Sequence, residues 1–298
     1  MTTVITVPPS LDDHTFEQVL EQVAPLPLDE KILVDARHAR WSSPFGLCAL
    51  LTLAQTRTER PAFAVPELDD TASYWARVGF FQHAENLFDL HGSYPKRREG
   101  TPESNALLDI TPISKASDIH DIAGRVQSRA KQIIQSELHL ETKAIIGFTM
   151  TLSEVCQNIL EHAGQGGWVA VQTYRWTKRL GRKVVQIAVC DAGLGFRKSL
   201  ESAPGHLPSA RWGDAAALEE AVIRGVSRFR DRSRGQGLAG ARNYVGRWQG
   251  KLSVRSGTAK ISIVPNWDDD PPLVENLPSF PGSQVQVIIP EAVSGIES

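Results

Sequence analysis

A polar segment between His91 and Ser104 constrains the fold more than any other feature of this sequence. It reads HGSYPKRREGTPES, with Pro, Gly and charged residues and no hydrophobic periodicity. Such a stretch cannot bury an apolar face and is typical of a linker between domains. We therefore expect one domain over residues 1–90, a linker over 91–104, a second domain over 105–292 and a short tail over 293–298.

Composition is compatible with two ordinary domains. Hydrophobic residues make up 41% of the 298 residues, which is enough apolar mass for two cores. The formal net charge of -2 gives no general attraction to nucleic acid or an anionic membrane, and argues against both as partners. The N-terminus MTTVITVPPSLDD lacks the pattern of a signal peptide, and no apolar run is long enough to span a membrane. These features predict a cytoplasmic protein.

The positions of the cysteine and histidine residues do not indicate a zinc site. Cys48, Cys156 and Cys190 are odd in number and sit in apolar stretches, so we expect buried thiols in a reducing compartment. The eight histidines are scattered, without a His-x-x-x-His spacing, and no Cys-x-x-Cys occurs. The spacing therefore argues against a built-in zinc site.

Hydrophobic patterning predicts a different fold class for each domain. The first alternates strands and helices, which favours an α/β layer structure; the expected strands are 4–7, 31–35 and 62–65, and the helices 12–23, 46–54 and 71–78. The second groups helices before strands, which favours an α+β sandwich with one mixed sheet and helices on one face. Its expected helices are 117–137, 141–162 and 238–248, its strands 106–110, 168–176, 182–190, 251–255, 260–264 and 284–289, with a Pro-rich surface loop before the last strand.

Three pieces of the second domain could carry chemistry. In TLSEVCQNILEHAG, Glu154 and Asn158 lie four residues apart on one helical face, where their oxygens could hold a hard cation; a solvated face is the alternative. In VVQIAVCDAGLGF, Asp191 ends a buried strand and Gly193 and Gly195 permit close approach to a ligand; an ordinary Asp-Gly turn is the alternative.

The third piece, GQGLAG, opens a helix with Gly235, Gly237 and Leu238, and free N–H groups at a helix N-terminus bind phosphate. It follows a basic stretch whose arginines could reach phosphates, serve an acidic partner or coat a mobile loop. These arginines are Arg224, Arg228, Arg230, Arg232 and Arg234.

In order and spacing, these pieces resemble the GHKL family of ATP-binding proteins, which includes gyrase B, heat-shock protein 90, bacterial histidine kinases and anti-sigma-factor kinases. Glu-x-x-x-Asn resembles the N box, Asp-x-Gly-x-Gly-Phe the G1 box and Gly-x-Gly-Leu the G2 box. Gly282-Ser283, before the strand QVQVIIP, resembles the family's small-residue box. The resemblance covers residues 105–292 and implies the Bergerat α+β fold, with ATP and Mg²⁺ as ligands.

The resemblance also implies residue roles. Glu154 would be the general base, Asn158 would coordinate Mg²⁺ and Asp191 would bind the adenine amino group. Segment 197–234 would form the ATP lid. The glycine-rich pieces would shape the base pocket and offer backbone groups to the phosphates through Gly193, Gly195, Gly235, Gly237 and Leu238.

The first domain resembles the STAS fold of anti-sigma-factor antagonists. The resemblance rests on KILVDARHARWSSPFGLCALLTLA and on YWARVGFFQ. Pro44 and Phe45 stand where the family carries two serines, the second of which takes phosphate, and Ser42 and Ser43 are out of register. The resemblance therefore implies an interaction or regulatory module without the phosphorylation switch.

Together the two resemblances imply a regulatory, slowly hydrolysing Mg²⁺-ATPase whose lid closure controls the binding of a protein partner; a homodimer is compatible with this. One alternative is a protein serine kinase of the anti-sigma type that acts on a separate STAS protein. Another is a non-catalytic nucleotide sensor, against which the presence of Glu154 argues. A histidine kinase fits less well, because no separate dimerisation segment precedes the helix that holds His120.

Overall fold

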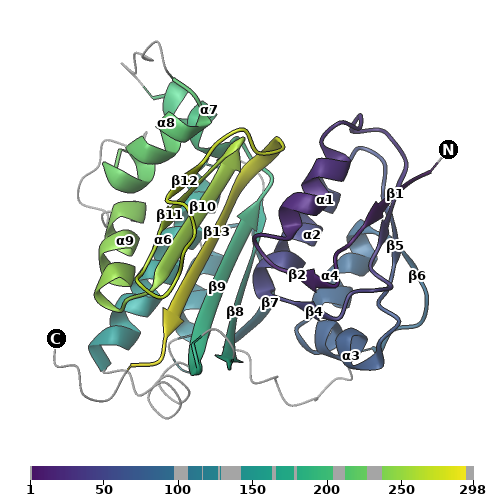
Figure 1. The fold of residues 1–298 in the computed structure, drawn as a ribbon, viewed down its shortest axis with the longest axis horizontal. Helices are drawn as coiled ribbons and strands as arrows, with labels where there is room; N and C mark the ends of the chain where they lie inside the picture. Colours follow the sequence, from purple (N-terminus) through teal and green to yellow (C-terminus); the bar gives the residue numbers. More distant parts are fainter. Residues whose placement is uncertain are drawn as a thin grey trace.

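The computed structural model describes residues 2–96, 107–115, 117–126, 128, 142–162, 166–177, 180–203, 212–226 and 237–292. Within these ranges the chain forms two units, each built around its own main sheet. The first unit has a parallel sheet and the second a larger antiparallel one, and Figure 1 shows the two units side by side. In the described part of the chain, no helix is long and apolar enough to cross a membrane.

The first unit is an α/β layer structure, as its alternating sequence predicts. Its sheet has the strand order β1-β3-β5-β6, and each adjacent pair is parallel. Parallel neighbours require crossover connections, and helices provide them here. The sequence pattern predicts no counterpart of α4 or β6. The elements are β1 Thr3–Thr6, β2 Ser10–Leu11, α1 Phe16–Val23, β3 Ile32–Asp35, β4 Trp41–Ser42, α2 Pro44–Thr56, β5 Ala62–Ala64, α3 Asp69–Arg77, α4 Phe80–Leu87 and β6 Asp89–His91.

In helix α1, the hydrophobic periodicity predicts the buried face correctly but not the first residue. Its four apolar positions at i, i+3, i+4 and i+7 are all buried, as predicted. The helix begins at Phe16 rather than at residue 12, because the Asp12 side chain holds the preceding turn in another conformation. Asp12 Oδ1 accepts hydrogen bonds from the backbone N–H groups of His14 at 3.1 Å and Thr15 at 2.9 Å.

Helix α2 is the central helix of the molecule. It is longer than the predicted 46–54 and starts at Pro44, where the Ser43 hydroxyl caps it by accepting from the Gly46 N–H at 3.1 Å. Nearly all of its residues are buried. A helix that is apolar on every side must be covered on every side. It lies between the two sheets and contacts β8, β9 and β13 of the second unit.

The second unit is built on a seven-stranded sheet of order β12-β11-β10-β13-β9-β8-β7. A helix over 117–126 matches the described part of the one predicted over 117–137, and the rest of that prediction lies outside the described residues. The remaining elements are β7 Leu108–Ile113, α6 Thr142–His162, β8 Gly167–Trp176, β9 Arg182–Asp191, α7 Gly195–Glu201, α8 Asp214–Leu218, the π-helix η1 Glu219–Ile223, α9 Gly237–Arg247, β10 Lys251–Gly257, β11 Ala259–Ile263, β12 Leu273–Val274 and β13 Phe280–Pro290.

The prediction of a mixed sheet in the second unit is wrong. Every strand pair between described residues of this sheet is antiparallel. Strands β9 and β10 point in the same direction and would form a parallel pair if they were neighbours. Strand β13, from the far end of the chain, lies between them and runs antiparallel to both. This late insertion is not visible in local sequence patterns.

The two faces of the large sheet have different partners. On β9, Val185, Ile187 and Val189 join the core formed with α6, α7, α8 and α9. The alternate residues Ala188 and Cys190 join the core of the first unit, against α2. Helices therefore cover one face of the sheet, as predicted, and the first unit covers the other (Figure 1). All three cysteines are buried free thiols, also as predicted.

Polar contacts add to this apolar boundary between the units. Arg255 of β10 is 2% exposed and binds Glu17 of α1 through Nε–Oε1 at 2.7 Å and Nη2–Oε2 at 3.1 Å. The hydroxyl groups of Tyr74 on α3 and Tyr174 on β8 lie 2.6 Å apart. A buried bidentate ion pair needs fixed geometry, so this pair favours one relative position of the two units.

The interpretation of 197–234 as one polar lid segment needs correction. Its described part contains α7, α8 and η1, and Leu200, Leu218 and Val222 from these helices are buried in the core of the second unit. These helices are too short for a convincing period in sequence, which is why the pattern missed them. Residues 204–211 and 227–236 lie outside the described residues.

The predicted linker is described only at its start. His91 ends β6, which pairs with β5, and the description stops at residue 96. The chain is described again from residue 107, and β7 runs over Leu108–Ile113 instead of the predicted 106–110. The Pro-rich loop before the last strand includes the short strand β12, which pairs with β11.

Candidate functional site

The centre of the candidate site is the carboxylate of Asp191, the last residue of β9. Because side chains alternate along a strand, Asp191 lies on the same face as Val189, which is the helix-covered face. Its Oδ1 accepts from the Gly193 N–H at 2.8 Å, and its Oδ2 accepts from the Ser283 N–H at 3.2 Å and from the Ser283 hydroxyl. The strand end, the glycine turn and β13 therefore fix this carboxylate together.

Two glycines make this arrangement possible. Gly282 has φ 76° and lies so close to Asp191 that a Cβ there would overlap the Asp191 carbonyl oxygen. Gly195 has φ 74°, and a Cβ there would lie 2.7 Å from Ser256 Oγ. The Ser256 hydroxyl accepts from the Phe196 N–H at 3.1 Å and donates to the Gly282 carbonyl at 2.7 Å. Both positions need a left-handed backbone and the absence of a side chain.

Burial raises the pKa of Asp191 to about 6, although the hydrogen bonds from Ser283 and Gly193 act in the opposite direction. Desolvation disfavours the charged form, and the donors compensate for only part of this. The side chain is 1% exposed, so a ligand can reach it only after the atoms that cover it shift. A carboxyl group with this pKa changes charge close to neutral pH, which is unusual for aspartate and frequent at functional sites.

Helix α6 carries the pair Glu154 and Asn158, as predicted. The helix packs against α9, β9 and α7, and Glu154 is half-buried. The side chain of Asn158 lies outside the described part of the structure. Glu154 is two turns beyond Gly147, which lies so close to Tyr244 of α9 that a Cβ would overlap the ring. Positions seven apart share a helical face, so Glu154 is on the side of α6 that faces α9.

The sheet determines how these two helices run. Helix α6 leads into β8 and α9 leads into β10. Strands β8, β9, β13 and β10 are consecutive antiparallel neighbours, so β8 and β10 point in opposite directions. The two helices are therefore antiparallel as well. Moving along α6 from Gly147 to Glu154 leads from Tyr244 toward Gly237, at the start of α9.

The same end of the unit holds Asp191. Strand β8 begins at Gly167, which pairs with Asp191, and α6 ends at His162 shortly before it. The C-terminal half of α6, the N-terminus of α9 and the end of β9 thus meet at one end of the sheet, on its helix-covered face. The topology brings together three pieces that are far apart in sequence.

The glycine-rich third piece is described in part. Helix α9 spans Gly237–Arg247, one residue earlier at each end than the predicted 238–248, and the Leu238 side chain is buried in the core. Gly235 lies outside the described residues, as do the arginines of 227–236. Arg224 is exposed, and its Nη1 lies 2.6 Å from Glu220 Oε1 one turn earlier in the sequence. This arginine therefore has a local partner on the surface.

Sequence reasoning missed one member of the site. Ser256 links the glycine turn after β9 to Gly282, and nothing in its own sequence context points to that role. The sequence singles out Ser283 beside Gly282, but the contact of Ser283 with Asp191 depends on β13 lying next to β9. That neighbour relationship is a property of the sheet, so only the fold could reveal it.

In the first unit, the segment that resembles the STAS phosphorylation loop is buried. Ser42 and Ser43 are fully buried, and Ser43 caps α2. Phe45 is also buried and packs edge-on against Phe16 at a centroid distance of 6.3 Å. No acceptor hydroxyl is presented to solvent at these positions.

The fold and the site define a class of protein in structural terms only. It is an α/β unit packed on the open face of an antiparallel sheet, whose opposite face carries helices and a buried carboxylate with a raised pKa. Compared with known proteins, the chain matches no family model, and no curated protein matches it significantly.

Proposed function

We propose that the second unit is a GHKL-type Mg²⁺-ATP-binding unit that hydrolyses ATP slowly, and that the first unit is a STAS-like regulatory module. The observation that carries the proposal is the Asp191 carboxylate, fixed at the end of β9 by Ser283 and Gly193 on the face that α6 covers. It supports recognition of a base, because an ionised carboxylate is an acceptor-only group and adenine offers an amino donor.

The residues present fit a nucleotide in two further respects. Gly195 and Gly282 let the turn after β9 and strand β13 come close enough to hold the Asp191 carboxylate in a fixed position, because a Cβ at either glycine would collide with backbone or Ser256. Glu154 and Asn158 offer the oxygen ligands and the carboxylate base that Mg²⁺-dependent hydrolysis needs, on a helix that ends near Asp191. ATP with Mg²⁺ would supply the phosphoanhydride bond and the neutralising charge.

Each group then has one task. Asp191 accepts a hydrogen bond from the base, which orients it. Asn158 would hold the cation through its amide oxygen. Glu154 would take the proton of a water that attacks the γ-phosphorus while the bond to the β-phosphate oxygen breaks and ADP leaves. The backbone N–H groups at the start of α9, around Gly237 and Leu238, would stabilise negative charge on phosphate.

The position of the first unit supports a regulatory role. Helix α2 packs on the face of β9 opposite the candidate site, against Cys190, the residue directly before Asp191. A shift of the β9 end on nucleotide binding would therefore alter the surface on which the first unit rests. This makes the first unit a module that responds to the nucleotide state and offers its outer surface to a protein partner.

The proposal is tested by incubating the full chain with γ-labelled ATP and Mg²⁺. Slow release of labelled phosphate, abolished by EDTA, is expected. Label that stays on an added STAS protein would favour the alternative serine kinase, and binding without turnover would favour a nucleotide sensor. Absence of ATP binding by calorimetry would overturn the proposal.

A further inference from the structure

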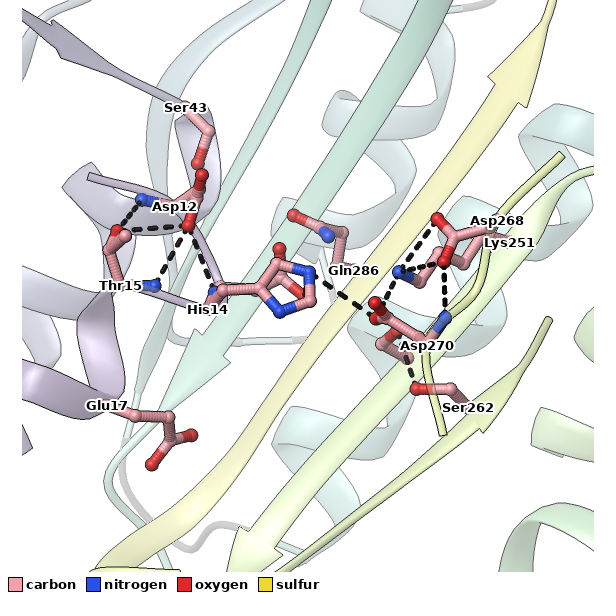
Figure 2. A network of polar contacts seen from close by, with 12 residues as sticks. Asp12, His14, Thr15, Glu17, Ser43, Lys251, Ser262, Asp268, Asp270 and Gln286 are labelled. Atoms are coloured by element: carbon pink, nitrogen blue, oxygen red, sulfur yellow. Dashed lines mark hydrogen bonds and ion pairs between the residues drawn. The ribbon is translucent and has the colours of Figure 1, made fainter. Parts of the chain in front are cut away.

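Two loops from opposite ends of the chain bring a small polar cluster together where the two units meet. Asp13 and His14 precede α1, and Asp270 belongs to the segment before β12. One carboxylate oxygen from each aspartate and a ring nitrogen of His14 lie within 4.8 Å of one another. Figure 2 shows His14 pointing from the first unit toward Asp270 of the second.

Asp13 is the unusual member of the cluster. It is 7% exposed, yet its Oδ2 accepts no hydrogen bond from any residue in the described ranges. The same oxygen lies 3.7 Å from His14 Nε2, so it is directed into the cluster. A buried carboxylate oxygen without a donor is destabilising unless a cation balances it.

The neighbouring charges do not provide that balance. Lys251 Nζ is occupied by Asp268, whose oxygens lie at 3.2 and 3.0 Å, and it also contacts Asp270 (Figure 2). The oxygen of Asp270 that Lys251 contacts, Oδ2, is the same one that lies 3.4 Å from His14 Nε2. None of these contacts of Lys251 reaches Asp13 Oδ2, so the lysine does not supply that buried oxygen with a donor.

We propose that Asp13, His14 and Asp270 bind a divalent transition-metal ion of the Zn²⁺ type, which fastens the first unit to the loop before β12. Bonds of about 2.0 Å in a tetrahedral site separate ligand atoms by roughly 3.3 Å. His14 Nε2 lies 3.4 Å from Asp270 Oδ2 and 3.7 Å from Asp13 Oδ2, close to that spacing. The His14 side chain is 42% exposed, which leaves a route for the ion and a position for a water ligand.

This site is separate from the proposed nucleotide site. Lys251 lies on β10 beside Leu252, which faces the helices, so Lys251 and the cluster lie on the opposite face of the sheet. The sequence argues against a zinc site because the known zinc motifs consist of ligands that are close together in the chain. Here the ligands come from its two ends.

The test is calorimetric titration of ZnCl₂ into the untagged full chain after EDTA treatment and dialysis. One ion per chain is expected. His14→Ala and Asp13→Asn should each weaken binding by at least about tenfold, the lower limit even for losing an outer partner of a metal ligand. His91→Ala, an exposed histidine on β6, is the matched control and should bind like the parent.

Thermal unfolding gives a second readout. Zn²⁺ at about 100 times its Kd should raise the Tm of the parent and of His91→Ala by roughly 5 °C, but should not raise the Tm of Asp13→Asn. Asp13→Asn keeps the size of the side chain, so this comparison can be made even if His14→Ala folds poorly. Absence of binding by the parent, or equal binding by all variants, overturns the proposal. A cluster that is stable without a metal ion would show no Zn²⁺ binding by the parent.

Discussion

Replacing Asp191 by Asn removes the charge of the candidate base site while keeping its shape. The parent carboxylate accepts from three donors of Gly193 and Ser283, and it would accept a further hydrogen bond from the adenine amino group. A charge-assisted hydrogen bond of this kind contributes about 1.5–3 kcal/mol. The variant should therefore bind ATP roughly 10- to 150-fold more weakly.

The assay is calorimetric titration with a non-hydrolysable ATP analogue and Mg²⁺, in parallel with the matching GTP analogue. Guanine carries a carbonyl oxygen where adenine carries the amino group, so the parent should prefer ATP. The variant amide can donate to that oxygen, and the preference should shrink. Equal losses for both nucleotides would indicate a damaged fold, and unchanged ATP affinity would refute the role of Asp191.

The same carboxyl links pH to stability. Its folded pKa of about 6 lies above the ordinary value of 3.8, so the folded state binds the proton more tightly than the unfolded state. Its stabilising contribution is present below the ordinary value and is lost as the pH rises through about 6, a loss of roughly 3 kcal/mol at ~1.4 kcal/mol per unit. Denaturant unfolding between about pH 4 and 7 should show this decline in the parent relative to Asp191→Asn.

Three further predictions concern other residues. Glu154→Gln should slow phosphate release by roughly 10²- to 10⁴-fold with little change in ATP affinity, whereas Asn158→Ala should weaken Mg²⁺-ATP binding as well, and equal turnover in parent and Glu154→Gln would remove Glu154 from catalysis. Intact-mass analysis after incubation with ATP and Mg²⁺ should find no phosphate on the first unit, and a phosphate on the serine pair before α2 would contradict the buried position of that pair. Arg255→Met should destabilise the chain by about 3–5 kcal/mol in denaturant unfolding, since it leaves Glu17 uncompensated, and adding Glu17→Leu should recover most of the loss.

Local sequence patterns determined the elements that are long or strongly periodic. The buried face of α1 follows from four apolar positions at helical spacing. The position of Asp191 at the end of a buried strand follows from an apolar run that stops before glycines, and the helix that starts at Gly237 follows from a glycine-rich piece after a polar stretch. These signals are local, because each depends on residues within one element.

Tertiary structure decided which of these elements meet. The insertion of β13 between β9 and β10 makes the sheet antiparallel and places Ser283 on Asp191. The burial of α2 between two sheets, and the meeting of His14 with Asp270, also depend on contacts between distant segments. Period and composition describe which face of an element is apolar, but not which other element covers it. That choice is made by packing the whole chain, and it is why Asp191 and the nearby Gly193 were predictable while the contact of Asp191 with Ser283 was not.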